Sequence, residues 1–463
     1  DHRDLHSFPT RRSSDLMLKG RERELAYLNK EYQSGSDRLL VLYGQKDVGK
    51  TALLAAFTED KKAFYYHAEE GSERQQLYLL GRQLQRIGFS LPLYPTYEEV
   101  FQCLDRKLLV IDEFQYLLKT GNGFVQALDS FLQNKTDPCM VLLCSSSISF
   151  VENHMVVKLG KLAHKLTGFL KLKELQLWDV AAYFPDYSRE DCVKVYAILG
   201  GLPGLWQAFD PAVSVAENIC RVLLSPGGRL REEGAHIVSR QLRECGVYFS
   251  ILGALAQGKN KLNELYQHTG FSRAKISVYL KNLMELELVE KVFSLDTPGR
   301  DNQRKAVYRI SHPLVRFWFC FLYADSSLLL RMTPLAYYEQ LVEPALTIYC
   351  ESCFSKVCQE YMQRENARHS LPIEITEFGS FAGKAGSIDY IGHNESGRYI
   401  VAFADYRDPV FLYEKYLQAK ALTGQAGIRP DYMYLFSGHS FDAKLEALEK
   451  ELDTLILIRM DDL

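Results

Sequence analysis

The sequence lacks any hydrophobic run long enough to cross a membrane. Its most apolar stretch, Phe317 to Tyr323, is far shorter than the roughly 20 residues that a transmembrane helix needs. The chain also lacks an excess of one charge, since its formal net charge is −3. We therefore expect no membrane partner, and any nucleic-acid site has to be a local basic patch. With 47% hydrophobic and 24% charged residues, the composition is that of an ordinary globular protein.

Paired cysteine motifs are scarce as well. The ten cysteines are scattered, and Cys103, Cys144 and Cys320 lie inside apolar patterns. This usage predicts a reducing, cytoplasmic compartment. The Cys350-x-x-Cys353 spacing resembles half of a metal site, but the sequence offers no second pair or His cluster near it. Buried helix cysteines are therefore the favoured interpretation.

The first sixteen residues, Asp1 to Leu16, do not read as part of a fold. Translated back codon by codon, they resemble a common short-read sequencing adapter in frame. We expect the natural chain to start at Met17, where no signal peptide begins, and we exclude residues 1–16 from fold reasoning as an artefact. The remaining length suits about three domains.

Residues 44–51 form a complete G-x-x-x-x-G-K-[ST] phosphate-binding loop. The loop lies between an apolar run at 39–43 and a helix-forming run at 52–57, which is the strand–loop–helix context that the motif requires. In such a loop the glycines let backbone N–H groups approach the phosphates, Lys50 reaches the terminal phosphates and Thr51 binds magnesium. The sequence thus predicts a bound nucleoside triphosphate. The residues expected to bind it are Gly44, Gln45, Lys46, Asp47, Val48, Gly49, Lys50, Thr51 and Ala52.

A pair of acidic residues follows the apolar run at 108–111. Asp112, at the tip of this expected strand, is placed to hold hydrated magnesium together with Thr51, and Glu113 to orient or deprotonate the attacking water. The adjacent glutamate favours hydrolysis, because a pure binding module needs only the aspartate. We therefore predict Glu113 and Lys50 as the catalytic residues.

Strands and helices alternate from residue 17 to about 178, which predicts an α/β P-loop NTPase domain whose parallel sheet is covered on both faces. Strands are expected at 39–43, 63–67, 108–111, 140–145 and 170–175. Ligands bind such folds at the carboxyl ends of the strands, and Ser146 follows the fourth expected strand. Its hydroxyl either senses the γ-phosphate or simply ends the strand.

A helical subdomain is expected at 179–238, followed by a winged helix-turn-helix at 239–325. Helices at 242–257, 261–268 and 272–286 and strands at 289–295 and 305–310 support the second assignment. The candidate DNA-contacting residues are Arg273, Lys275 and Lys281 in the third helix and Arg300, Arg304 and Lys305 in the wing. Two interpretations stay open: contact with DNA phosphates, or a winged helix that only packs against other parts of the protein.

The last part of the chain, residues 335–463, is expected to be a further α/β domain. Its strands are predicted at 373–378, 387–391, 399–404 and 433–437, with a helix at 411–421.

From Met17 onward the chain resembles the archaeal-type P-loop ATPases of the STAND/AAA-related class. The resemblance rests on the P-loop and on the segments 20–25, 112–116, 145–149, 200–203 and 313–319. It implies ATP as the nucleotide and a Gly-x-Pro motif that couples nucleotide state to the helical subdomain. It also implies a C-terminal domain similar to the restriction-endonuclease-like PD-(D/E)xK nucleases.

The chain departs from this family at two places near the nucleotide. Asp47 stands where a basic residue is usual, so an anion would lie in the phosphate cradle if its side chain points inward. Lys165 stands where the family has an arginine, and a lysine cannot supply the bidentate fork of an arginine finger.

A third departure concerns the nuclease-like domain. By resemblance, Glu351 fits the leading helix glutamate and Asp389 the first motif aspartate, but Phe403-Ala404-Asp405 stands where the family has Glu-x-Lys. One metal ligand and the lysine that positions water are thus missing. Asp405 and Arg407 have the right spacing two residues later, yet arginine stays protonated and is a poor proton carrier. We predict a degenerate, inactive site and a structural or interaction role.

The leading hypothesis is a magnesium-dependent ATPase whose nucleotide state repositions the winged helix and the nuclease-like module. Double-stranded DNA, an unidentified protein and a second copy of the chain are the candidate macromolecular partners. The alternative is a nucleotide-gated DNA-binding or scaffold protein with negligible hydrolysis. An ATP-dependent nuclease is a third, less favoured reading.

Overall fold

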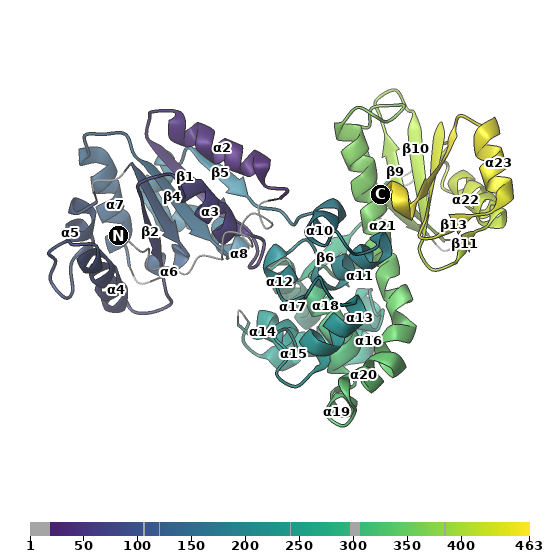
Figure 1. The fold of residues 1–463 in the computed structure, drawn as a ribbon, viewed down its shortest axis with the longest axis horizontal. Helices are drawn as coiled ribbons and strands as arrows, with labels where there is room; N and C mark the ends of the chain where they lie inside the picture. The colour runs from purple at the N-terminus through teal and green to yellow at the C-terminus, as the bar shows by residue number, and fades with distance from the viewer. Residues whose placement is uncertain (1–18, 105–106, 120, 241, 297–305, 384–385) are drawn as a thin grey trace. The chain divides into compact units, whose positions relative to one another are not determined.

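The computed structural model describes residues 19–104, 107–119, 121–240, 242–296, 306–383 and 386–463. The described chain divides into two compact units (Figure 1). Unit 1 holds the residues before Gln176 together with Leu202–Gly204, and unit 2 holds Gln176–Gly201 and Leu205–Leu463. The expectation about residues 1–16 concerns a segment outside the described residues. The domain boundaries expected from the sequence stay predictions.

Unit 1 is built on a five-stranded sheet with the order β2-β3-β4-β1-β5, in which every neighbouring pair is parallel. The strands are β1 (Arg38–Tyr43), β2 (Ala63–His67), β3 (Leu108–Asp112), β4 (Met140–Ser145) and β5 (Gly168–Lys171). The central strands β3 and β4 are buried along their whole length, as their continuous apolar runs require. The predicted parallel α/β sheet is confirmed.

One helix precedes the first strand of unit 1, and the others connect the strands in sequence order. They are α2 (Glu22–Gln33), α3 (Lys50–Thr58), α4 (Glu73–Arg86), α5 (Tyr97–Gln102), α6 (Gln115–Leu118), α7 (Gly123–Asn134), α8 (Ile148–Asn153), α9 (Met155–Leu159) and the 3₁₀ helix η1 (Gly160–Lys165). Alternate residues of the strands, such as Val41, Ile111 and Leu143, pack with side chains of α4, α5 and α7 into one buried cluster. The period of two along each strand selects which residues enter it.

The fifth strand differs from its predicted range of 170–175, since β5 covers Gly168–Lys171. Its only neighbour in the sheet is β1, and the last register pair is Tyr43 with Lys171. The chain of β1 then turns into the phosphate-binding loop, so residues beyond Leu172 have no strand to pair with. The apolar residues up to Leu175 pack without extending the sheet.

Unit 2 begins with a helical region. It contains α10 (Leu177–Tyr183), α11 (Arg189–Leu199), α12 (Pro203–Trp206, whose first two residues group with unit 1), α13 (Val215–Asn218), the π-helical η2 (Ile219–Leu224) and α14 (Glu233–Ser239). A winged helix-turn-helix follows, as predicted: α15 (Cys245–Ala256), α16 (Leu262–Thr269), α17 (Arg273–Glu285) and the antiparallel strands β6 (Val289–Val292) and β7 (Val307–Ile310). Its core is a buried cluster that includes Leu252, Leu265, Ile276 and Leu280.

More helices lead to the last part of unit 2: α18 (Pro313–Trp318), the π-helical η3 (Phe319–Tyr323), α19 (Ser326–Leu329), α20 (Pro334–Tyr337), the π-helical η4 (Tyr338–Val342) and α21 (Glu343–Ala367). The C-terminal α/β part carries a mixed sheet of order β14-β12-β10-β9-β8. Its elements are β8 (Glu377–Gly383), β9 (Gly386–His393), β10 (Tyr399–Asp405), β11 (Val410–Phe411), α22 (Tyr413–Gln425), β12 (Tyr432–Ser437), β13 (Ser440–Phe441), α23 (Ala443–Glu451), β14 (Leu455–Arg459) and η5 (Met460–Asp462).

Two expectations for this sheet need correction. The first strand is β8 at Glu377–Gly383 and not 373–378. The side-chain amide of Asn366 donates to the carbonyl oxygen of Ile375 and accepts its N–H, both at 2.9 Å. A residue whose N–H and C=O are used in this way cannot join a ladder. A further strand, β14, was not predicted from the sequence; it pairs in parallel with β12.

All ten cysteines are free. Within the described ranges, none of the helices has the length and apolar character needed to cross a membrane.

Candidate nucleotide site

The phosphate-binding loop joins β1 to α3. Gly49 is the N-cap of α3 and has φ 101°, while Gly44 has no room for a side chain, because a Cβ would lie 2.6 Å from the carbonyl oxygen of Leu172. Gly49 cannot cap the helix with a side chain, and the first N–H groups of any α-helix have no intrahelical acceptor. Together with the helix dipole, these donors make the start of α3 a place that attracts an anion.

Lys50 lies at the base of this loop with only 7% of its surface exposed. Its ammonium donates to the carbonyl oxygens of Gly44 at 2.9 Å and Gln45 at 2.8 Å. Burial lowers the pKa of Lys50, and the nearby carboxylates of Glu113 and Asp112 act in the opposite direction. A buried cation is thus held over the loop by neutral carbonyls, next to the exposed Thr51 in the first turn of α3.

Asp112 ends β3 and is buried, with two donors on one of its oxygens. Tyr65 OH donates to Asp112 Oδ2 at 2.7 Å, and His67 Nδ1 lies 3.0 Å from the same atom. Burial by itself raises the pKa of Asp112, but the hydrogen bonds from His67 and Tyr65 outweigh it and lower the pKa. The same contact raises the pKa of His67. The second carboxylate oxygen, Oδ1, accepts the N–H of Glu113 at 3.0 Å.

Glu113 follows in a left-handed conformation, with φ 52°, which is uncommon for a residue other than glycine. Its Oε2 accepts from Ser146 N at 3.2 Å, Ser146 Oγ at 2.8 Å and Gln115 Nε2 at 2.5 Å. Gln115 is itself buried, and its Oε1 has no hydrogen-bond partner among the described residues. The carboxylate of Glu113 is thus turned toward the end of β4.

Asp47, in the phosphate-binding loop, contacts the segment of residues 202–204. Its carbonyl oxygen accepts the N–H of Gly204 at 2.9 Å, and it has φ 65°. A Cβ on Gly204 would lie 2.7 Å from Asp47 Oδ1, so the carboxylate is beside the 202–204 segment. On Gly49, a Cβ would meet the ring of Pro203 at 3.3 Å. Pro203 of the Gly-x-Pro motif and Gly204, which follows it, therefore lie against the phosphate-binding loop.

Replacing Gly204 with alanine tests this close contact. The new Cβ would stand 2.8 Å from Asp47 Cα, so the backbone has to shift, and overpacking of this kind costs about 1–3 kcal/mol. We expect Gly204→Ala to lower the melting temperature and to weaken nucleotide binding. Gly424→Ala in α22 is the control, since nothing lies within 4 Å of its Cβ. A Gly204→Ala protein that melts and binds like the parent would contradict the contact.

Lys165, which stands in place of the family's arginine, has a different partner. Its ammonium lies 2.5 Å from Asp129 Oδ1 in α7. In this ion pair Asp129 neutralises the positive charge of Lys165 that an arginine-finger role would need.

Three residues of the site, Tyr65, His67 and Gln115, were not predicted from the sequence. The strand at 63–67 was predicted, and its alternation places Tyr65 and His67 on one face. The order of the strands in the sheet, which puts β2 beside β3, could not be predicted from the hydrophobic pattern. Gln115 was quoted only as part of a motif, because its burial depends on how α6 packs.

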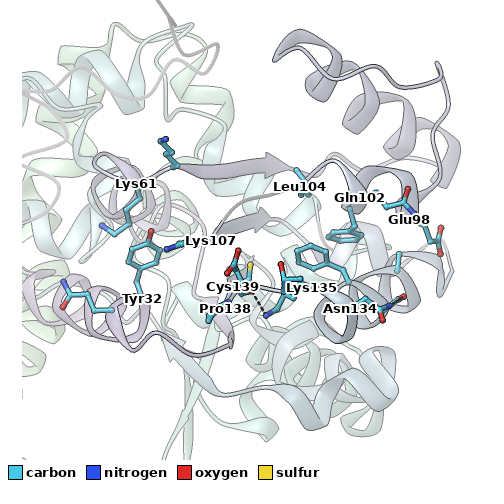
Figure 2. A pocket seen from close by; sticks show the side chains of 18 of the residues that line it. Tyr32, Lys61, Glu98, Gln102, Leu104, Lys107, Asn134, Lys135, Pro138 and Cys139 are labelled. Carbon is cyan, nitrogen blue, oxygen red and sulfur yellow. Dashed lines mark hydrogen bonds between the residues drawn. The ribbon is translucent and has the colours of Figure 1, made fainter.

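A cavity of about 1020 Å³ lies elsewhere in unit 1 (Figure 2). Lys62, Lys107 and Cys139 line it, and each directly precedes a strand. It is therefore at the amino edge of the sheet, opposite to the phosphate-binding loop. Lysines of its lining already have carboxylate partners, Lys61 with Asp60 at 2.6 Å and Lys135 with Asp37. Because the cavity lies at the edge of the sheet opposite to the phosphate-binding motif, the candidate nucleotide site is the loop.

The predicted DNA-contact residues of α17 are all exposed. The guanidinium of Arg273 lies over the ring of Tyr266 at 4.3 Å and donates to Asn263 at 2.8 Å. Lys275 lies over the ring of Phe271 at 4.9 Å, and Lys281 is 3.8 Å from Glu285. The wing residues Arg300, Arg304 and Lys305 lie outside the described residues.

The described base of the wing is engaged in packing. Leu295 N donates to Ser380 O at 2.7 Å, and Ala382 N donates to Ser294 Oγ at 3.0 Å. The wing thereby covers β8, the edge strand of the C-terminal sheet. This contact fits the packing interpretation for the wing and leaves α17 open to solvent.

Two of the three nuclease-motif residues, Asp389 and Asp405, have protein partners. Asp389 accepts from Ser355 Oγ at 2.6 Å and Ala404 N at 2.9 Å, and burial raises its pKa. Asp405 pairs with Lys415 and accepts the N–H of Arg407 at 3.1 Å. Glu351, in α21, adds to the raised pKa of Asp389 through its charge. Within the described part of the chain, no three His, Cys, Asp or Glu side chains are grouped so that they could hold a metal ion.

Comparison with known families places this site in context. Residues 18–208 match a family described as an ATPase domain predominantly from Archaea. This part of the chain is similar to that family. Downstream of it, residues 250–291 match the ArsR family of bacterial regulatory proteins, and residues 318–409 match a family of archaeal and bacterial proteins of unknown function. The helix-turn-helix assignment is thereby confirmed.

Individual proteins are similar to the ATPase domain and to longer parts of the chain. An uncharacterized protein of Methanocaldococcus jannaschii is 25% identical over 397 residues, which cover 82% of this chain and 85% of that protein. An uncharacterized ATP-binding protein of the same organism is 38% identical over 47 residues, or 10% of this chain and 80% of that protein.

Two solved structures are also similar. The Walker-type ATPase PABY2304 of Pyrococcus abyssi is 19% identical, with a TM-score of 0.46, covering 65% of this chain and 95% of its own. The ORC2 protein of Aeropyrum pernix, solved as ADPNP–ADP complexes, is 14% identical, with a TM-score of 0.45, covering 71% of this chain and 97% of its own.

Proposed function

We propose that the ATPase domain binds ATP with magnesium in the loop of residues 44–52 and hydrolyses it. The observation that carries the proposal is Lys50, a buried ammonium whose direct hydrogen-bond partners in the structure are the carbonyls of Gly44 and Gln45. Burying a charge is costly unless an opposite charge accompanies it. The nearby carboxylates of Glu113 and Asp112 act in this sense, and the phosphates of ATP would add further negative charge at the N-terminus of α3.

The residues present fit magnesium as well. Thr51 contributes an exposed hydroxyl and Asp112 a carboxylate whose pKa is lowered, so it stays ionised. Magnesium prefers hard oxygen ligands and keeps several waters, which suits one hydroxyl and one carboxylate together with phosphate oxygens. We propose that Thr51 and Asp112 hold the ion, which would neutralise charge that develops on the phosphates.

We assign to Glu113 the role of orienting and deprotonating the attacking water. In the structure its Oε2 is occupied by Ser146 and Gln115. Ser146 Oγ would then sense the γ-phosphate: once that hydroxyl turns to a phosphate oxygen, Glu113 loses one donor and becomes available as a base. This gives the hydroxyl at the end of β4 a role beyond ending the strand.

The second candidate is a nucleotide-gated DNA-binding or scaffold protein with negligible hydrolysis. The specific observation in its favour is the engagement of Glu113 by three donors. Steady-state hydrolysis by the chain from Met17, measured with and without duplex DNA, separates the two. Turnover above background supports the ATPase. Tight ATP binding with no turnover in either condition would favour the gated scaffold.

We propose further that nucleotide state reaches unit 2 through Leu202–Gly204. This segment touches the phosphate-binding loop while the chain on both sides of it belongs to unit 2. A change of loop conformation at Asp47 would thereby act on the helical region that precedes the winged helix.

DNA is the partner that we propose for α17, whose exposed face carries Arg273, Lys275 and Lys281. Each phosphate contact that is lost should lower the slope of log affinity against log salt by about 1. We therefore expect Lys275→Ala with Lys281→Ala to reduce this slope by about 2, measured by duplex binding between low and moderate salt. Lys444→Ala with Lys450→Ala in α23 is the charge-matched control, since both lysines are exposed there. Duplex binding that is absent even at low salt would leave the winged helix as a packing module.

A further inference from the structure

The carboxylate of Asp112 is held from the neighbouring strand. β2 and β3 pair in parallel, with His67 directly in register with Asp112 and Tyr65 in register with Val110. Both β2 side chains reach the same atom, Asp112 Oδ2: Tyr65 OH at 2.7 Å and His67 Nδ1 at 3.0 Å. Tyr66, between them, points to the other face and donates to Gln76 Oε1 at 3.0 Å.

Two donors on one oxygen fix how the carboxylate lies. Rotation of the Asp112 carboxylate would break both contacts at once, so Oδ2 is directed toward β2. The other oxygen, Oδ1, accepts the N–H of Glu113 at 3.0 Å, and a carboxylate oxygen can accept a second hydrogen bond. Oδ1 is therefore the oxygen left for a ligand at the carboxyl edge of the sheet.

We infer that Tyr65 and His67 are positioning residues for magnesium, acting through Asp112 and not on the nucleotide. The inference rests on the proposed function, in which Asp112 helps to hold the ion. Partners that orient a metal ligand typically change metal affinity by about 10–100-fold when they are removed. Neither side chain belongs to the phosphate-binding motif, and neither was singled out by the sequence.

The decisive measurement is the coupling between magnesium and nucleotide. The affinity of a fluorescent ADP analogue is measured in EDTA and in saturating Mg²⁺, for the full chain and for Tyr65→Phe and His67→Ala. We expect affinity in EDTA to stay within about twofold, while the tightening by Mg²⁺ falls by about 10-fold in each variant. In hydrolysis, the apparent Mg²⁺ constant should rise by about 10–100-fold, with kcat regained at high Mg²⁺.

Two further variants separate positioning from folding. His67→Asn keeps an N–H donor near the place of Nδ1, so it should regain most of the coupling that His67→Ala loses. Tyr66→Phe removes a hydroxyl from the same strand but from the opposite face, and should keep the parental coupling. Melting temperatures identify any variant that fails to fold. If His67→Ala does not fold, the coupling measured in Tyr65→Phe and His67→Asn tests the inference.

Three results would overturn the inference. The first is parental coupling in both Tyr65→Phe and His67→Ala, and the second is an equal loss of affinity with and without Mg²⁺. The third is a parent that binds no nucleotide under either condition. This last result would remove the proposed function, and the inference with it, whereas the first two leave ATP binding intact.

Discussion

Lys50→Ala is expected to abolish nucleotide binding, with a loss of affinity of at least about 100-fold, which corresponds to about 2.7 kcal/mol. The change removes the buried ammonium that now donates to Gly44 and Gln45 and that would face the terminal phosphates. Isothermal titration with ATP and Mg²⁺ measures the effect directly.

Two companions make the Lys50 result interpretable. Lys50→Met fills most of the same volume without the charge, so a loss in both variants with unchanged melting temperature is electrostatic and not a packing defect. Lys30→Ala is the matched control, because the side chain of Lys30 is exposed in α2 and lies outside the loop, and it should change affinity by less than about threefold. Parental affinity in Lys50→Met would refute the role that we assign to Lys50.

Glu113→Gln is expected to keep ATP binding within about threefold and to lower turnover by 100-fold or more, since a general base contributes roughly 10²–10⁴ in rate. Glutamine can still accept the hydrogen bond that Ser146 Oγ now donates at 2.8 Å, so the local fold should persist. What it cannot do is take a proton from water. Single-turnover hydrolysis beside a binding titration separates the two effects.

Glu70→Gln is the control for Glu113→Gln. Glu70 is an exposed acid that pairs with Lys119 at 2.8 Å, and exposed pairs contribute little, so its loss should leave turnover unchanged. If Glu113→Gln turned over at the parental rate, Glu113 would not be the base, and Gln115 would become the residue to test next.

Local patterns were sufficient for much of the fold. The ranges of β2 and β4 were predicted to the residue. The continuous apolar run of β4 is typical of a buried parallel strand, whereas β2, at the edge of the sheet, alternates between buried and more exposed residues. The winged helix followed from the order of helix, helix, helix and two strands. The errors in strand ranges occurred where pairing with a neighbouring strand sets the end of a strand. The strand β5 ends because β1 turns into the loop. The backbone near Ile375 is hydrogen-bonded by Asn366 and not by a strand.

The C-terminal acidic residues show how tertiary contacts settle what a motif leaves open. Spacing alone allowed Asp405 and Arg407 to replace a missing metal ligand and lysine. In the structure Asp405 pairs with Lys415 and accepts the N–H of Arg407, while Asp389 is held by Ser355 and Ala404. These partners satisfy the carboxylates without an ion, and the prediction of an inactive module stands as a prediction.

By itself, the sequence determined the phosphate-binding loop, the acidic pair at 112 and 113 and the parallel α/β class, because each depends on neighbours in the chain or on a short hydrophobic period. Only the tertiary structure decided which side chains meet at the carboxyl edge of the sheet. The order of the strands brings Tyr65 and His67 into hydrogen-bond contact with Asp112, and Ser146 with Glu113. The chain also folds back so that Gly204 donates a hydrogen bond to Asp47. Such contacts join residues from 33 to 157 positions apart, and no local pattern encodes them.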